Sequence, residues 1–310
     1  MTKPFAACTL FLLLLAAASS GHAQVVQPHS NEDCRDIERD YQIIAADANT
    51  LQRNSALFSA ADRGCEALAK TLLDAGAALQ ARDRRGAMPL THAAREGHVR
   101  LVELFLARGA PIDARNVDGG TALLGAAEHQ KPSTVALLLK KGADPNLSGR
   151  SGLTALIAAA FQGNDRIAED LLAHGADAKA RDLTGKSAMV YAAARGFDDI
   201  VTRLLAAGVD AKERYGNDLT ALMWAAGHDE GVGAAAVEHV IDVLIAHGAA
   251  LDAADNRGRT ALMIAAEAGD AAVVDLLLTR GADRSSRDKT GKTALDLAAS
   301  PEVRARLQAK

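Results

Sequence analysis

The stretch that decides the fold is residues 149–181, which read GRSGLTALIAAAFQGNDRIAEDLLAHGADAKAR. Residues 182–214 follow with DLTGKSAMVYAAARGFDDIVTRLLAAGVDAKER, in which glycine, alanine and leucine keep the same places. The Gly-Ala or Gly-Val pair of this layout recurs, in steps of 33 residues apart from one of 40, at Gly76, Gly109, Gly142, Gly175, Gly208, Gly248 and Gly281. A Thr-Ala-Leu or Ser-Ala-Met tripeptide keeps the same steps from Thr121 onward. The chain is therefore a tandem array of one structural unit.

The layout of one unit predicts two helices separated by short turns. A glycine such as Gly152 closes the entering turn, where a positive φ angle is accessible mainly to glycine. Thr154 comes two residues later and is placed to cap an Ala-rich helix over residues 154–162, which Gly163 ends. The second helix carries paired apolar positions that form one buried stripe, for example Val273, Val274, Leu277 and Leu278. The Gly-Ala pair then supplies a left-handed stop.

The polar residues that recur with the unit predict structural roles. Asp83, Asp182, Asp255 and Asp288 stand at the same turn position, where an aspartate bonds the backbone of the turn. His174 and His247 stand just before the stop glycine. An imidazole there interacts favourably with the negative end of a helix, so neither is expected to be a ligand.

The composition excludes several classes of protein. Of 310 residues, 49% are hydrophobic, so the chain can bury a core, but only 3% are aromatic. The core must therefore consist mostly of alanine, leucine, valine and isoleucine. The formal charge of −4 gives none of the basic character that neutralises phosphates. No nucleic acid partner is expected.

The first 23 residues have the layout of a secretory signal peptide, with Lys3 before an apolar stretch and small residues at Gly21 and Ala23. The alternative is a membrane anchor, but the stretch from residue 5 to residue 18 is shorter than the ~20 residues that span a bilayer. Cleavage before Gln24 leaves no segment able to insert into a membrane. We therefore expect residues 24–53 to form a linker and capping helix before the repeats.

Cleavage of the first 23 residues leaves only Cys34 and Cys65 of the three cysteines. Cys34 shares an expected helix face with Ile37, Tyr41 and Ile44. An exported chain favours a Cys34–Cys65 disulfide, and two buried free thiols are the alternative.

The array resembles the ankyrin repeat family, whose unit is a 33-residue helix pair with a Thr-Pro-Leu-His motif. Residues 83–98, DRRGAMPLTHAAREGH, come nearest to that pattern, whereas most units carry Thr-Ala-Leu in its place. The resemblance covers residues 54–310 and implies an all-α ankyrin solenoid. About eight units are expected, and they begin near residues 54, 83, 116, 149, 182, 215, 255 and 288. Pro301 starts a polar last helix that suits a capping unit.

The resemblance also implies a partner-binding surface at the turn tips and the exposed side of the first helices. Carried over by position, this surface comprises Arg84, Arg85, Arg95, Glu96, Asp118, Glu128, His129, Arg150, Leu153, Phe161, Gln162, Lys186, Arg195, Leu219, Arg257, Arg259 and Glu267. Phe161 occupies a position that is polar or small in the other units, so we expect it to be exposed as an anchor. Leu153 and Leu219 are further apolar candidates at turn tips. Tyr191 and Trp224 are expected in the core.

The sequence predicts no catalytic site, because it lacks the motifs of nucleotide binding, serine hydrolysis and zinc hydrolysis. No cofactor and no metal are expected. One irregularity stands out: the sixth unit has seven extra residues between Ala226 and Val237. His228, Asp229, Glu230 and His239 lie in or near this insertion, so a metal-dependent or hydrolytic activity of the 227–239 loop is the alternative function.

We expect a non-catalytic, monomeric binding module that is exported to a bacterial periplasm. The periplasm is inferred from the short signal and from the occurrence of the family in bacterial envelopes. The module would bind a protein partner in the concave groove that stacked units create. A scaffold for an envelope enzyme and an inhibitor or immunity protein are both compatible with this expectation, and so is a simple spacer.

Overall fold

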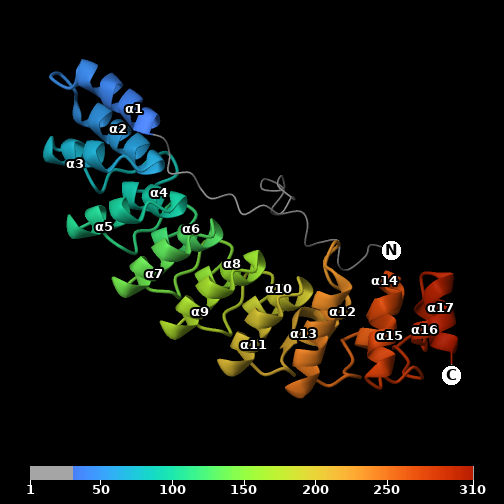
Figure 1. The fold of residues 1–310 in the computed structure, drawn as a ribbon. Coiled ribbons are helices and arrows are strands. Elements are labelled where there is room, and N and C mark those ends of the chain that lie inside the picture. The colour runs from blue at the N-terminus through green and yellow to red at the C-terminus, as the bar shows by residue number, and fades with distance from the viewer. Residues whose placement is uncertain (1–30, 310) are drawn as a thin grey trace.

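The computed structural model describes residues 31–309, which form a curved array of helix pairs (Figure 1). The expected signal peptide, residues 1–23, lies outside the described residues. Helix α1 (Asn31–Ile44) precedes the pairs. The first helices of the eight units are α2 (Thr50–Arg63), α4 (Pro89–Glu96), α6 (Ala122–Glu128), α8 (Ala155–Gln162), α10 (Ala188–Ala194), α12 (Ala221–Ala226), α14 (Ala261–Ala268) and α16 (Ala294–Leu297). The second helices are α3 (Glu66–Asp74), α5 (Val99–Ala107), α7 (Pro132–Lys140), α9 (Asp165–Ala173), α11 (Asp198–Ala206), α13 (Ala234–Ala246), α15 (Ala271–Thr279) and α17 (Pro301–Gln308).

The helices form two layers. Each first helix packs against the first helices of the neighbouring units, and the second helices pack against one another in the same order. Figure 1 shows α4 to α14 along the inner side of the arc, with the second helices from α5 to α13 along its outer side. The expected all-α ankyrin solenoid is thus confirmed, and its first helices line the concave side.

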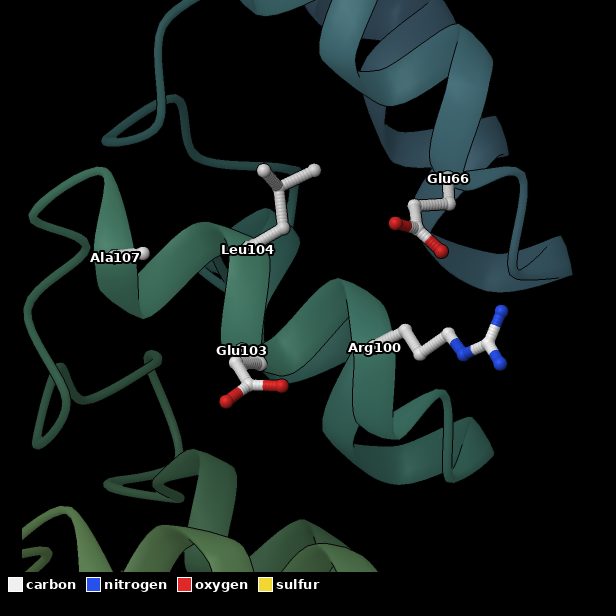
Figure 2. Close-up of a pocket in the computed structure, with 5 residues that line it drawn as sticks. All are labelled: Glu66, Arg100, Glu103, Leu104 and Ala107. Carbon is white, nitrogen blue, oxygen red and sulfur yellow. The ribbon is translucent and has the colours of Figure 1, made fainter.

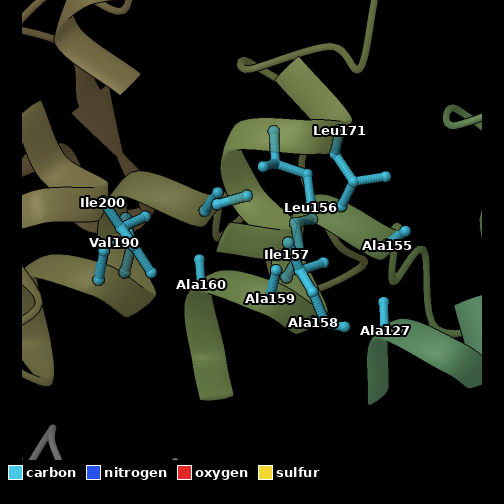
Figure 3. Close-up of a cluster of buried hydrophobic side chains, with 14 of the residues drawn as sticks. Ala127, Ala155, Leu156, Ile157, Ala158, Ala159, Ala160, Leu171, Val190 and Ile200 are labelled. Atoms are coloured by element: carbon cyan, nitrogen blue, oxygen red, sulfur yellow. The ribbon is translucent and has the colours of Figure 1, made fainter. Parts of the chain in front are cut away.

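Alanine allows the close packing of these layers. In α8, every residue from Ala155 to Ala160 is at most 3% exposed. Leu156 and Ile157 fill the space between units, while the small Ala159 and Ala160 let the neighbouring helices approach (Figure 3). Side chains from α9 and α11, including Leu171 and Ile200, complete the same core. The core therefore runs continuously through the array, and no unit buries its apolar face alone.

The helix starts follow the expected capping chemistry at most units. The Thr154 hydroxyl accepts a hydrogen bond from the Ile157 backbone N–H at 3.3 Å. The threonines at the same position in four other units do the same, namely Thr121, Thr220, Thr260 and Thr293. The Ser187 side chain makes no such bond, which corrects the expectation for that unit. The second unit replaces the cap with Pro89 at the first turn, where the missing N–H has no helical acceptor.

The turn aspartates bond the backbone as expected. Oδ1 of Asp182 accepts the backbone N–H of Thr184 at 2.8 Å and that of Lys186 at 3.0 Å. Asp83, Asp255 and Asp288 make the same pair of bonds in their own turns. His174 and His247 also confirm their prediction, since each Nδ1 lies within 2.8 Å of the carbonyl four residues earlier.

A ladder of arginines, which was not predicted from the sequence, joins successive turns. Nη1 of Arg82 donates to the carbonyl of Gly86 at 2.6 Å and to that of Arg115, 33 residues further on, at 2.8 Å. Arg115 donates in the same way to Gly119 and Ser148. Arg214 repeats both bonds, to the carbonyls of Asp218 and Ala254, and Arg181 repeats the bond to the next unit, at the Arg214 carbonyl. Ser148 and Ala254 interrupt the ladder.

The N-terminal end of the array is closed by α1. A disulfide joins Cys34 of α1 to Cys65, which confirms the pairing favoured from the sequence. Tyr41 is buried against the core, but Ile44 is 38% exposed and so does not complete the expected apolar face. The first repeat helix begins at Thr50, so the expected boundary at residue 54 falls inside α2.

At the other end, α17 packs on α15 and α16. Val303 and Leu307 are buried there, while the other side chains of the helix are exposed, as a capping unit requires. No helix within residues 31–309 is long and apolar enough to cross a membrane.

The sixth unit departs from the others in two places. Its entering turn holds the short strands β1 (Arg214–Tyr215) and β2 (Leu219–Thr220) around the 3-10 segment η2 (Gly216–Asp218). The seven extra residues were expected between Ala226 and Val237, and part of them lengthens the bend between the two helices. They also lengthen α13, which has 13 residues where α11 has nine. Only residues 227–233 remain as a loop.

Candidate partner-binding surface

The predicted surface residues lie on the turns and on the exposed side of the first helices, and their burial differs. The exposed ones are Arg84, Arg85, Glu128, His129, Arg150 and Glu267. The half-buried ones are Arg95, Glu96, Asp118, Leu153, Phe161, Gln162, Lys186, Arg195, Arg257 and Arg259. Leu219 is only 7% exposed, because β2 turns its side chain into the core, so its prediction as a surface residue was wrong.

Several of the predicted charges are already engaged within the chain. Arg85 pairs with Asp118 of the next unit, with Nη2 and Oδ2 3.1 Å apart. Arg259 pairs with Glu267, and its Nε lies 4.0 Å from the buried Asp288. Both arginines therefore have an ionic partner within the chain before any other protein binds.

Phe161 is half-buried rather than fully exposed. The guanidinium carbon of Arg195 lies 4.4 Å from its ring centroid, and the Tyr191 ring meets it edge to face at 5.6 Å. Arg195 is held by Asp229, with Nη1 and Oδ2 3.3 Å apart. The expectation of a freely exposed anchor is therefore corrected: the next unit covers part of the ring.

Phe161, Tyr191 and Trp224 form one aromatic cluster on α8, α10 and α12. Tyr191 and Trp224 were expected inside the core, but both are half-buried at its edge. The ammonium of Lys186 lies 5.6 Å from the Tyr191 centroid and 5.4 Å from that of Trp224. The Tyr191 hydroxyl donates to Oδ2 of Asp182 at 2.6 Å. Cations and partly exposed aromatic rings thus meet at the middle of the first-helix layer.

A polar cluster that was not predicted from the sequence joins the first two units. His92 Nδ1 lies 2.7 Å from Asp62 Oδ1, and Nε2 lies 3.0 Å from Asp83 Oδ2. Burial alone would lower the pKa of His92, but the two carboxylates outweigh it and raise the pKa above its usual value. One feature of the sequence could have indicated this cluster: His92 has the same position in its repeat as Tyr191 and Trp224.

Glu128 and His129 lie between these clusters, at the end of α6. Although Glu128 is exposed, surrounding protein atoms desolvate its carboxyl and raise its pKa. Desolvation also lowers the pKa of His129, whose Nδ1 lies 3.0 Å from the Gly125 carbonyl. The Glu128 carboxyl and the His129 ring are thus less hydrated than the same groups would be on an open surface.

The residues of the alternative metal site are not brought together. His228 Nε2 lies 2.9 Å from Asp270 Oδ2, whereas the Asp229 carboxylate faces Arg195. His239 is directed to α11, where its Nδ1 lies 3.9 Å from Asp198 Oδ2. Within residues 31–309 there is no group of three or more histidine, cysteine, aspartate or glutamate side chains placed to hold a metal ion.

Two open depressions lie on the opposite layer. One, of about 390 Å³, lies between α3 and α5 and is lined by Glu66, Arg100, Glu103, Leu104 and Ala107 (Figure 2). Another, lined in part by Leu172 and Arg203, lies between α9 and α11. Arg203 is engaged by Asp165 and Glu169. Both are shallow gaps between second helices and lack a convergent catalytic group.

Comparison with family models identifies the array. A model of ankyrin repeats in three copies matches residues 13–116, 57–149, 90–182 and 155–234, and one of ankyrin repeats in many copies matches residues 244–298. The chain belongs to the ankyrin repeat family. Membership supports a protein–protein interaction module, in a family that is generally non-catalytic. A search of curated proteins found no match.

Proposed function

We propose that the chain is an exported, non-catalytic ankyrin protein of the bacterial periplasm, which acts as a monomer and binds a protein partner on its concave side. The observation that carries the binding proposal is the aromatic cluster with Lys186 and Arg195. Partly exposed tryptophan and tyrosine beside arginine are the side chains that dominate binding energy at protein interfaces.

Two observations support export. The first 23 residues have the order of a basic head, an apolar stretch and small residues that signal peptides share. The Cys34–Cys65 disulfide is typical of proteins that leave the reducing cytosol. A deletion of residues 2–23 tests export by fractionation: the full chain should reach the periplasm and lose the leader, and the deletion should remain in the cytosol. Full-length chain in the cytosol contradicts export.

Capture of partners from envelope extract tests the binding surface. We expect Phe161→Ala to lower the recovered partner at least tenfold, because the lost ring is part of the hot spot. Leu172→Ala on the opposite layer is the matched control, since it also shortens a half-buried apolar side chain. Circular dichroism checks that both variants fold. Equal recovery by the two variants contradicts the concave surface.

A scaffold and an inhibitor would use the same surface, and their affinities distinguish them. An inhibitor or immunity protein must hold its target at about nanomolar Kd, whereas a scaffold functions at micromolar Kd. Titration of the captured partner decides between the two roles.

A further inference from the structure

The turns that enter the second to fifth units form a continuous row, here called the turn row: residues 84–85, 117–118, 150–151 and 183–186. The backbone N–H of Val117 donates to the Arg85 carbonyl at 2.9 Å. That of Arg150 donates to Asp118, and that of Leu183 to Ser151, at 2.5 and 2.9 Å. Backbone bonds thus fix each turn against the next, so side chains on the row hold constant spacing.

The turn row is basic although the chain is acidic. Its basic residues are Arg84, Arg85, Arg150 and Lys186, and its acidic residue is Asp118. Since Asp118 pairs with Arg85, the row has an excess of three basic residues. The neighbouring Asp83 and Asp182 carboxylates are directed into their turns, where they accept backbone N–H groups. The whole chain has a formal charge of −4, so the turn row is a positively charged strip on an acidic protein.

Two exposed apolar side chains interrupt the basic residues. Val117 is 56% exposed and Leu183 is 79% exposed. Along the tips the order is Arg84, Val117, Arg150 and Leu183, so that cationic and apolar tips alternate. At the end of the row Lys186 lies over Tyr191 and Trp224, which joins the turn row to the aromatic cluster.

We propose that the turn row binds an acidic segment of the partner protein, with aspartate or glutamate at the basic tips and an apolar side chain on the aromatic cluster beside Lys186. The proposal rests on the proposed function and specifies the partner's chemistry. Opposite charge steers the segment to the row and sets its register. The aromatic cluster supplies the apolar contact that charge alone does not provide.

Selection from a library of random 12-residue peptides displayed on phage tests this chemistry. The bait is the full chain, folded with its disulfide intact. We expect the selected peptides to be enriched in aspartate and glutamate and to carry at least one aromatic or leucine residue. A synthetic peptide of the selected sequence should bind less tightly as salt is raised, because exposed charges are screened.

Variants locate the binding. Lys186→Gln should weaken the selected peptide about tenfold, and Lys186→Arg should restore it, because the cation is what the peptide recognises. Both variants keep the backbone N–H that residue 186 donates to Oδ1 of Asp182, and circular dichroism checks that each variant folds like the wild type. Lys140→Gln is the matched control, since Lys140 is an exposed lysine on α7 of the opposite layer.

Four results overturn the proposal. One is selected peptides with no excess of acidic residues, another is equal affinity for the Lys186→Gln and Lys140→Gln variants, and a third is failure of the selection to enrich any sequence. A 12-nucleotide single-stranded DNA that binds as tightly as the acidic peptide also overturns it, in favour of phosphate recognition. In each case the capture experiment with Phe161→Ala still decides the proposed function independently.

Discussion

Nδ1 of His92 in α4 lies 2.7 Å from Oδ1 of Asp62 in α2, and this contact joins the first repeat unit to the second. The other ring nitrogen faces Asp83 at 3.0 Å. A neutral imidazole has one N–H and satisfies only one of these carboxylates, whereas a protonated imidazole donates to both. The arrangement therefore favours the charged ring.

We predict that His92 makes stability depend on pH. Its pKa is raised in the folded chain, so its contribution is fully present below about pH 6.5, the unperturbed value. The contribution is lost as pH rises through the higher folded-state pKa. Thermal unfolding from pH 5.5 to pH 8.5 should show this loss in the wild type and not in His92→Asn, which should also be less stable by about 1–3 kcal/mol at pH 5.5. Parallel curves for the two proteins contradict the assignment.

Asp83 gives the opposite dependence at lower pH. Burial raises its pKa, but hydrogen bonds from the Ala87 and Arg85 backbone and from His92 outweigh this and lower it. The Asp83 carboxylate therefore stabilises the folded chain fully above about pH 3.9, the unperturbed pKa. This stabilisation is lost as the pH falls through the lower pKa that Asp83 has in the folded chain. The wild type should therefore be most stable between the two transitions.

We predict that Gly163→Ala destabilises the array more than Gly175→Ala. Both glycines have positive φ, of 72° and 85°, which costs another residue about 1–2 kcal/mol. An added Cβ at Gly163 would lie 2.5 Å from the Phe197 ring, whereas at Gly175 no heavy atom lies within 4 Å. Overpacking adds about 1–3 kcal/mol at Gly163 alone. Urea unfolding measures both, and equal losses contradict the packing of Phe197 on Gly163.

We predict that Ser148→Arg stabilises the array by completing the arginine ladder. Residue 148 stands 33 positions after Arg115 and 33 before Arg181. By analogy with Arg82, an arginine there would donate to the carbonyls of Gly152 and Arg181, and each net bond is worth about 0.5–1.5 kcal/mol. Ser148→Lys is the control, because it adds the charge without the forked donors. If both variants have the wild-type midpoint in urea, the ladder contributes nothing to stability.

We predict that loss of the disulfide loosens the N-terminal end first. Cys34→Ser removes a crosslink across a sequence separation of 31 residues, and closing a loop of this length is worth about 3–4 kcal/mol in the chain-entropy model. Since α1 packs on α2, its amides should lose protection from hydrogen exchange while those of α8 keep theirs. An equal loss of amide protection in all helices would contradict the view that the disulfide stabilises only the N-terminal end.

Much of the fold could be predicted because each unit repeats its own local signals. The period places Gly163 and Thr154 at helix ends, and Asp182 in its turn, from chemistry that acts within a few residues. Contacts between units are less predictable. Leu153, Lys186 and Leu219 share one repeat position, yet of these three side chains only that of Leu219 is buried, because the turn of the sixth unit has a different backbone.

The candidate site shows the same limit. The repeat predicts that Phe161 lies at the end of a first helix, where α8 carries it, but not that Arg195 of the next unit lies over its ring. That contact depends on the directions of side chains in two units. The pairing of His92 with Asp62 joins residues 30 positions apart and follows no repeated motif. Such contacts require the stacking geometry and not only the period.

Hydrogen–deuterium exchange of the full chain, with and without the captured partner, tests the central claim most directly. We predict that the partner protects the turn row and the segments that carry the aromatic cluster, residues 150–162, 182–195 and 220–226, while α9 and α11 on the outer side exchange unchanged. Protection confined to α9 and α11, with none on the first helices, would contradict binding on the concave side.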